Sequence, residues 1–280
     1  MPEFTSLPVD RDWDLNDVTD QLATTRPGTV YLVGAGPGAA DLITVRGLRL
    51  LRSADVVVYD ALIASDLLAE ISPHAERVFA GKRGYCVGNT LQETIHDLLV
   101  NRAREGLTVV RLKGGDPCVF GRGGEEAEYL AEHGIPFEIV PGVTSAVGAC
   151  AAANIPLTHR DAGQAVALVT GHFDPDSPDC RLDWAGLAGM SNVVVYMGLR
   201  HLDRIAAKLL NAGMAIDTPA AVIERATRPD QRIIDGTLET IAGLAKDAAV
   251  QAPAVLVVGE CVRFRERLLA LAEQTAGVVA

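Results

Sequence analysis

The chain has 280 residues and a formal net charge of −11, and 49% of its residues are hydrophobic. That length is enough to bury a large core in one or two domains. The acidic balance argues against a broad nucleic-acid-binding surface, although a local group of basic residues could still hold an anionic small molecule.

The cysteines and the N-terminus indicate where the protein works. The five cysteines are scattered without C-x-x-C spacing, and no histidine pair has metal-ligand spacing, so we expect reduced structural thiols and no metal site. Residues 1–26 are acidic and polar and contain no signal-peptide core, which predicts a disordered N-terminal extension. No uninterrupted apolar stretch reaches membrane-spanning length. We therefore expect a cytoplasmic protein with no membrane partner.

Apolar runs alternate with helical patterns in the first half of the chain. Strands are predicted at Thr29–Val33, Asp55–Tyr59, Thr108–Leu112 and Phe137–Val140. Helices are predicted at Ile43–Arg52, Leu62–Ile71, Thr90–Glu105, Gly124–His133 and Thr144–Ala153. Because this is a βαβ succession, we expect a mostly parallel sheet with right-handed crossovers.

The stretch Asn154–Gly163 breaks this pattern with proline, glycine and charge. We expect the domain boundary there, with an N-terminal α/β domain over 27–157 and a C-terminal α/β domain over 158–280. Later strands are predicted at Val166–Thr170, Val193–Met197, Ala220–Glu224, Arg232–Asp235 and Ala254–Val258. Later helices are predicted at Leu202–Asn211, Leu238–Asp247 and Val262–Gln274. The link Ala226–Gln231 is too short for a crossover helix, so the C-terminal sheet should be antiparallel or mixed.

Two glycine loops follow two of the predicted strands. Gly34-Ala-Gly-Pro-Gly38 follows the first strand, and five glycines lie within eleven residues from Gly114 to Gly124. Glycine has no Cβ, so such loops allow a ligand to approach the backbone closely. Because the carboxyl ends of parallel strands meet at one edge, both loops should face one cleft.

The first loop is compatible with two kinds of cofactor. Gly34, Gly36 and Ala39 formally match the dinucleotide fingerprint, and Asp60 ends the next strand, as in a nicotinamide or flavin site. Pro37 weakens this reading, because proline offers no N–H to a phosphate. The loop suits a ligand with hydroxyls, an amine or a positive charge, such as S-adenosylmethionine. Asp116 could bind such a ligand or act as a turn or N-cap acid before Pro117.

Nine motifs in order carry a resemblance to a known family. They are Val-Gly-Ala-Gly-Pro-Gly (33–38), Val-Val-Tyr-Asp (57–60), Gly-Lys-Arg (81–83), Arg-Leu-Lys-Gly-Gly-Asp-Pro (111–117), Phe-Gly-Arg-Gly-Gly-Glu-Glu (120–126), Val-Pro-Gly-Val-Thr-Ser (140–145), Pro-Leu-Thr-His-Arg (156–160), Val-Thr-Gly-His (169–172) and Tyr-Met-Gly-Leu (196–199). Together they closely resemble the uroporphyrinogen-III C-methyltransferases of the tetrapyrrole methyltransferase superfamily. The resemblance covers residues 27–262 and implies the two-domain tetrapyrrole methylase fold, with a parallel N-terminal sheet, a mixed C-terminal sheet and a cleft between them.

The resemblance also implies a cofactor, an assembly and a reaction. S-adenosylmethionine would bind in the cleft of a homodimer and methylate carbons 2 and 7 of uroporphyrinogen III, giving precorrin-2 for sirohaem or cobalamin and two S-adenosylhomocysteine. The chain carries no dehydrogenase and chelatase portion of the kind fused to some members, so we expect methylation alone. The cofactor contacts would be Pro37, Gly114, Gly115, Asp116, Val119, Thr144, Ser145, Met197 and Ala226, the last being a position where related sequences often carry glycine.

Two residues match catalytic positions of the family. Asp60 matches the proton acceptor and Lys82 the proton donor, although Asp60 could be an ordinary turn acid and Lys82 could neutralise a propionate instead. The polyanionic substrate requires cations near the loops, for which the candidates are Arg46, Arg83, Lys113, Arg122, His159 and Arg160. Taken alone, each such base is more often a solvated surface charge, and His159-Arg160 at the predicted domain junction are better placed than the rest.

Alternatives remain open in three classes. A methyltransferase of the same fold could act on a later precorrin, a protein or ribosomal RNA. A nicotinamide-dependent oxidoreductase would bind NAD(H), and a non-catalytic tetrapyrrole carrier would bind porphyrin without transferring a methyl group.

Overall fold

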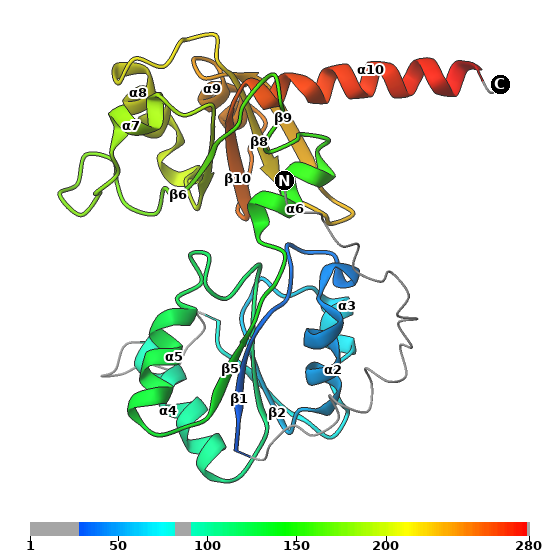
Figure 1. Cartoon of the computed structure of the whole chain (residues 1–280), viewed down its shortest axis with the longest axis vertical. Helices are drawn as coiled ribbons and strands as arrows, with labels where there is room; N and C mark the ends of the chain where they lie inside the picture. Colours follow the sequence, from blue (N-terminus) through cyan, green and yellow to red (C-terminus); the bar gives the residue numbers. More distant parts are fainter. Residues whose placement is uncertain (1–27, 82–90, 279–280) are drawn as a thin grey trace, which may run out of the picture.

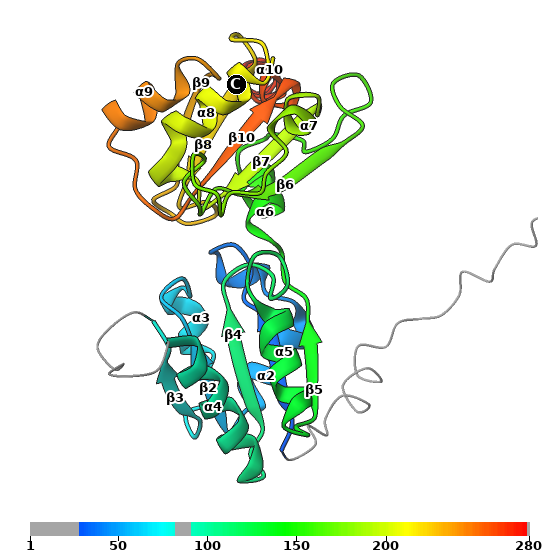
Figure 2. The same cartoon turned by 90° about the vertical axis from the view of Figure 1, so that its left-hand side faces the viewer.

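The computed structural model describes residues 28–81 and 91–278. These residues form two α/β domains, each built on a five-stranded sheet, and they stack one above the other (Figure 1). The view turned by 90° shows the same two sheets flanked by helices (Figure 2). The predicted N-terminal extension over 1–26 lies outside the described residues, as do Lys82 and Arg83.

The first sheet is parallel throughout, with strand order β3-β2-β4-β1-β5. Its strands are β1 (Val30–Gly34), β2 (Val56–Tyr59), β3 (Glu76–Phe79), β4 (Val109–Lys113) and β5 (Phe137–Val140). Its helices are α2 (Val45–Ser53), α3 (Ser65–Ala69), α4 (Leu91–Arg104) and α5 (Gly123–Glu132). Apolar side chains of α2 and α3 pack on one face, and those of α4 and α5 pack on the other. The predicted parallel sheet is confirmed.

Strand β3 was absent from the sequence prediction. Its residues Glu76-Arg77-Val78-Phe79 are mostly exposed, because β3 is the edge strand beside β2. An edge strand does not need the apolar run that marks the buried strands. The predicted helix Leu62–Ile71 is also shorter than expected, because residues 60–62 form a turn before α3 begins at Ser65.

The second sheet has strand order β6-β7-β10-β8-β9. Strands β6 and β7 are parallel, whereas β7–β10, β10–β8 and β8–β9 are antiparallel, so the predicted mixed sheet is confirmed. The strands are β6 (Val166–Thr170), β7 (Asn192–Tyr196), β8 (Pro219–Glu224), β9 (Arg232–Thr237) and β10 (Ala254–Gly259). The helices are α7 (Trp184–Ala188), which was not predicted, α8 (Leu202–Asn211), α9 (Ile241–Asp247) and α10 (Arg263–Val278). Three short 3-10 turns are η1 (Ala40–Leu42), η2 (Leu199–His201) and η3 (Glu260–Val262).

The packing of helix α6 (Ser145–Ala152) indicates where the first domain ends. Its buried face, Ala146, Ala149 and Cys150, packs in one cluster with strands of the second sheet. The predicted boundary at 157 assigned this small-residue helix to the first domain. On its packing, we propose that the domains divide at residues 141–144, between β5 and α6.

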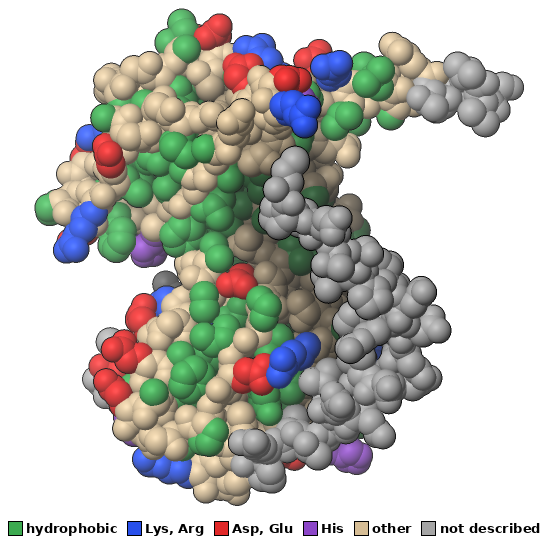
Figure 3. All heavy atoms as spheres, in the orientation of Figure 1, with side chains coloured by type: hydrophobic (Ala, Val, Ile, Leu, Met, Phe, Trp, Pro, Cys, Tyr) green, Lys and Arg blue, Asp and Glu red, His purple; other side chains and the backbone are tan. Residues whose placement is uncertain are grey.

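The space between the two domains is visible as a hollow in the molecular surface (Figure 3). In the part of the chain that the structure describes, helices lack the combined length and apolarity needed to cross a bilayer.

Candidate active site

The two glycine loops meet at the carboxyl edge of the first sheet. Strands β1 and β4 are neighbours, so the turns that follow them lie side by side. Gly36 and Gly115 form an antiparallel bridge, in which Gly115 N–H donates to Gly36 C=O at 2.7 Å and Gly36 N–H donates to Gly115 C=O at 3.2 Å. The sequence-based expectation that both loops face one edge is therefore confirmed.

A third turn, after β5, packs against both glycine loops. A Cβ on Gly142 would lie 2.2 Å from the carbonyl oxygen of Gly115, and one on Gly34 would lie 2.6 Å from the Cα of Gly142. No side chain fits at either position, which is the physical reason for glycine there. The three turns therefore form one rigid backbone surface.

Asp116 joins two of these turns. Its Oδ1 accepts from the N–H groups of Cys118 at 2.8 Å and Val119 at 3.2 Å, and its Oδ2 accepts from Gly142 N–H at 3.0 Å. The turn role weighed from the sequence is thus realised, and the carboxylate sits between the β4 and β5 turns. A contact of Asp116 with the cofactor stays a prediction.

The first glycine loop has few amides left for an anion. Ala35 N–H donates to Lys113 C=O at 2.8 Å, Gly36 N–H is used by Gly115, and Ala39 N–H donates to Thr227 Oγ1 at 2.9 Å. Pro37 has no N–H at all. A phosphate-binding turn works through unpaired amides, and these three are already paired within the protein, so the loop offers a dinucleotide fewer donors than its glycine spacing suggests.

Two elements of the second domain hold this loop from outside. A Cβ on Gly148 of α6 would lie 2.4 Å from Cγ of Pro37, and a Cβ on Gly38 would lie 2.7 Å from the carbonyl oxygen of Ala226. Pro37 therefore packs directly on α6, and Gly38 packs on the link between β8 and β9. The predicted contacts Pro37 and Ala226 lie at the junction of the two domains.

Tyr196, at the end of β7, ties the start of α6 to the second sheet. The Tyr196 hydroxyl accepts from Ala146 N–H at 3.1 Å and shares a hydrogen bond of 2.7 Å with Thr144 Oγ1. Burial raises the pKa of Tyr196.

The next residue, Met197, is 49% exposed and has a positive φ of 55°, a conformation that concentrates at functional sites. Ser145 Oγ lies 3.5 Å from the Cβ position of Gly115.

Eight of the nine predicted cofactor contacts lie in or beside the interlocked turns, and the ninth, Met197, follows Tyr196 in the chain. Val119 packs against the same cluster as α6 and Ala226, and Gly114 lies against Leu62, where a Cβ would be 3.0 Å from Cβ of Leu62. These residues come from both domains and surround the interlocked turns. Their contact with a ligand stays a prediction.

Asp60 lies one strand away from the second glycine loop. Strand β2 pairs with β4 so that Tyr59 is opposite Leu112, which places Asp60 beside Lys113. Asp60 Oδ1 accepts from Leu62 N–H at 2.8 Å, and its side chain is half-buried. The turn expected from the sequence is therefore present, and the carboxylate stands at the carboxyl edge of the sheet.

Lys113 differs from its expected role in substrate binding. It is 5% exposed, and its ammonium pairs with the buried carboxylate of Glu126 at 2.8 Å. Arg111 Nε approaches the same Glu126 oxygen at 3.2 Å. Burial first, and the charge of Arg111 second, lower the pKa of Lys113. Lys113 therefore belongs to a buried ion cluster beneath the site.

The other candidate bases that the structure describes lie at the surface of the two domains. Arg46 pairs with Glu138 and Arg122 with Glu125, both as exposed pairs, which contribute little to stability and can exchange partners. His159 stacks on Phe264 with ring centroids 4.0 Å apart, and Arg160 is exposed. Arg83 and the catalytic candidate Lys82 lie outside the described residues.

Several residues of this site were missed from the sequence. Tyr196, Thr227, Arg228 and Glu126 all contact the turns or the cluster beneath them. Glu126 could have been singled out, because Arg111 and Lys113 lie in an apolar strand and such buried bases need an acidic partner. Tyr196 begins the motif Tyr-Met-Gly-Leu but was not chosen as a site residue. No sequence signal distinguished Thr227 and Arg228, whose partners lie far away along the chain.

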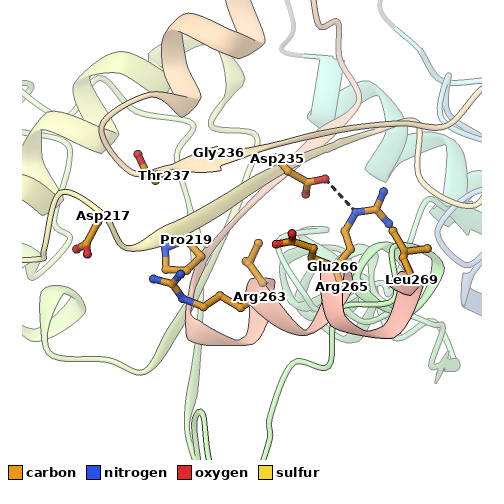
Figure 4. Close-up of a pocket in the computed structure, with 10 residues that line it drawn as sticks. Asp217, Pro219, Asp235, Gly236, Thr237, Arg263, Arg265, Glu266 and Leu269 are labelled. Carbon is orange, nitrogen blue, oxygen red and sulfur yellow. Dashed lines mark hydrogen bonds and ion pairs between the residues drawn. The ribbon is translucent and has the colours of Figure 1, made fainter. Parts of the chain in front are cut away.

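A separate surface pocket of about 270 Å³ lies between α10 and β9 in the second domain (Figure 4). Asp235 and Arg265 pair across it at 3.1 Å. Its lining contains none of the predicted site residues. We therefore keep this pocket apart from the site at the domain junction.

The fold and the interlocked turns define a two-domain α/β protein with a cleft at the carboxyl edge of its parallel sheet. Within that class, the chain belongs to the Tetrapyrrole (Corrin/Porphyrin) Methylases, whose sequence profile matches residues 29–242. The family predicted from the nine motifs is thus confirmed.

Individual relatives support the same assignment. The chain is 49% identical over 253 residues to an S-adenosyl-L-methionine-dependent uroporphyrinogen III methyltransferase of Methanosarcina barkeri, covering 90% of this chain and 97% of that protein. It is 47% identical to a siroheme synthase of Thiobacillus denitrificans, covering 90% of this chain and 52% of that protein. The chain therefore spans about half the length of the siroheme synthases it matches.

Solved structures agree in fold. A uroporphyrin-III C-methyltransferase from Thermus thermophilus, solved in complex with S-adenosylhomocysteine, superposes with a TM-score of 0.72 at 42% identity, covering 84% of this chain and 99% of that one. A cobalt precorrin-4 methyltransferase superposes with a TM-score of 0.75 at 33% identity, covering 84% of this chain and 96% of that one. The predicted fold class is confirmed.

Proposed function

We propose that this chain transfers methyl groups from S-adenosylmethionine to carbons 2 and 7 of uroporphyrinogen III, giving precorrin-2 and two S-adenosylhomocysteine. The observation that carries the proposal is the hydrogen bonding of the first glycine loop. The amides of Ala35, Gly36 and Ala39 are already donated within the protein, and Pro37 has none. The loop therefore suits a cofactor without phosphate, and the matching Thermus thermophilus structure was solved with S-adenosylhomocysteine.

The cofactor would lie among the nine predicted contacts: Pro37, Gly114, Gly115, Asp116, Val119, Thr144, Ser145, Met197 and Ala226. When bound, S-adenosylmethionine supplies an electrophilic methyl group on its sulfonium. The protein would hold the substrate carbon in line with that group, and such positioning is worth roughly 7–11 kcal/mol in well-oriented reactions. The interlocked glycine turns provide the rigid surface that positioning requires.

Asp60 would accept the proton that the methylated ring loses. The carboxylate ends β2 at the same sheet edge as the glycine turns, and Leu62 N–H holds one of its oxygens. A base within reach of the departing proton accelerates such a step by about 10²–10⁴-fold. Lys82, the candidate proton donor, remains a prediction outside the described residues.

The exposed bases would bind the substrate carboxylates. Arg46 and Arg122 would exchange their present acidic partners for a carboxylate. His159 and Arg160 would contribute from the segment between α6 and β6. We keep Arg83 in this group from its motif alone. Lys113 is left out because it is buried against Glu126.

The decisive assay is anaerobic incubation of the purified protein with uroporphyrinogen III and labelled S-adenosylmethionine. We expect a product two methyl groups heavier. No mass gain would contradict the proposal. In a substrate panel with the same labelled donor, transfer to a later precorrin, a protein or ribosomal RNA instead would favour another member of the fold. Asp60→Ala should lose turnover by about 10²–10⁴-fold while it binds S-adenosylhomocysteine normally. Full activity of that variant would refute the base assignment.

Calorimetry separates the cofactor alternatives. S-adenosylhomocysteine should bind and NADH should not, whereas preferential binding of NADH would favour an oxidoreductase. We also propose that the chain forms a homodimer in the cytoplasm, as the family resemblance implies. Sedimentation velocity and cell fractionation test these two points.

A further inference from the structure

The link between β8 and β9 reaches across to the first domain. Thr227 Oγ1 accepts from Ala39 N–H, and Arg228 Nη2 donates to the carbonyl oxygen of Leu62 at 2.6 Å. Leu62 and Arg228 are 166 residues apart in the chain. The half-buried Arg228 side chain therefore makes a direct hydrogen bond between the domains, at the carboxyl edge of the first sheet where Asp60 lies.

The link presents Arg228 in a fixed conformation. Arg225 and Thr227 have positive φ values of 47° and 64°, which residues other than glycine hold only when their surroundings impose them. Thr227 N–H donates to Gln231 Oε1 at 2.7 Å, and Arg225 pairs with Asp230 at 2.6 Å and with the buried Glu224 at 2.9 Å. These bonds connect residues within the link to one another and to β8, so the backbone that carries Arg228 is held in one conformation.

Leu62 connects Arg228 to the candidate base. The same residue whose carbonyl accepts from Arg228 donates its N–H to Asp60 Oδ1 at 2.8 Å. Its Cβ also lies against Gly114, where a side chain would approach to 3.0 Å. A shift of Leu62 would therefore move the carboxylate relative to the glycine turn.

We propose that Arg228 is a positioning residue for the methyl-transfer reaction, acting from the second domain through Leu62 to orient Asp60. This rests on the proposed role of Asp60 as the proton acceptor. Because the guanidinium belongs to one domain and the carboxylate to the other, the base is aligned only when the two domains are correctly apposed. A misplacement of about 1 Å can reduce a rate by as much as about 10²-fold.

The test compares Arg228→Met with Arg228→Lys. The Met variant keeps the aliphatic stem and loses the donors, and we expect its kcat to fall by roughly 10- to 100-fold. Its KM for uroporphyrinogen III and its affinity for S-adenosylhomocysteine should stay within about threefold of the parent. Lys keeps a donor group, with its N–H bonds on one nitrogen, and should restore part of the lost kcat. Arg267→Met, on the exposed part of α10, is the matched control and should leave all three quantities unchanged.

A double variant shows whether Arg228 acts through Asp60. Adding Arg228→Met to Asp60→Ala should slow single-turnover methyl transfer by less than about threefold further, because residues that act together are not additive. If the double variant lost the product of the two separate rate losses, the inference would be overturned. It would also be overturned if Arg228→Met lost S-adenosylhomocysteine affinity by the same factor as kcat. Normal turnover by Arg228→Met beside an inactive Asp60→Ala would overturn this inference alone. Full turnover by Asp60→Ala would overturn the base assignment and this inference together.

Discussion

Pro37 and Gly148 are in contact across the two domains, with Pro37 lying where a side chain on Gly148 would project. The Cβ position of Gly148 is 2.4 Å from Cγ and 2.7 Å from Cβ of Pro37. Helix α6 therefore supports the first glycine loop through a position that tolerates only glycine. The contact joins the second domain to the loop that we propose to bind the cofactor.

Gly148→Ala should weaken cofactor binding. The added methyl group must displace either the proline ring or the helix, and overpacking of this kind costs about 1–3 kcal/mol. We expect S-adenosylhomocysteine affinity to fall by about tenfold or more in calorimetry, together with a lower midpoint of urea unfolding. Gly243→Ala in α9 is the matched control, since a Cβ there meets nothing within 4 Å. That change should be neutral or stabilise the helix by about 0.5–1 kcal/mol. Equal behaviour of the two variants would contradict the contact.

Asp116→Asn should loosen the two glycine turns. The carboxylate accepts three backbone N–H groups, and an amide in its place can present an oxygen on one side only. We expect a loss of about 1–3 kcal/mol in unfolding free energy, measured by urea denaturation. Asp161→Asn, at an exposed position after His159, is the control and should change stability by less than about 0.5 kcal/mol. An unchanged unfolding midpoint in Asp116→Asn would mean that the turns do not depend on this carboxylate.

Tyr196→Phe should weaken the start of α6. The variant keeps the ring but loses the hydroxyl that accepts from Ala146 N–H and bonds Thr144. Leaving the Ala146 amide unpaired in a buried position costs about 1–3 kcal/mol. We expect lower stability and a several-fold loss of S-adenosylhomocysteine affinity, measured by denaturation and calorimetry. Tyr129→Phe is the control because its hydroxyl bonds Asp97 on the surface of the first domain, and its cofactor affinity should stay the same.

The buried Lys113 predicts a pH dependence of stability. Burial lowers the pKa of Lys113 in the folded state below its usual value of 10.5. Between the lowered pKa and 10.5 the unfolded chain therefore binds more protons than the folded protein, so the free energy of unfolding rises with pH in that window. Lys113→Met removes this titration. As the pH rises towards 10.5, the unfolding free energy of the parent should therefore increase relative to that of Lys113→Met. A constant difference would contradict the lowered pKa.

The elements and the family could be read from local sequence. The strands Phe137–Val140 and Val166–Thr170 were predicted with their observed bounds, because short runs rich in β-branched and aromatic residues between turn residues mark strands. Both are edge strands and only partly buried. The link Ala226–Gln231 correctly predicted that β8 and β9 are antiparallel, since a chain that short cannot cross over. The edge strand β3 and the short helix α7 escaped notice, because neither needs a continuous apolar pattern.

The sequence by itself determined the two-domain α/β fold, the glycine turns and Pro37, whose missing N–H is a property of the residue alone. Tertiary structure decided which charges are available, burying Lys113 against Glu126 while leaving Arg160 exposed. It also decided that Arg228 meets Leu62 and that α6 packs on Pro37. Local patterns follow from backbone geometry within a few residues, whereas these contacts join segments that come together only when both sheets have formed.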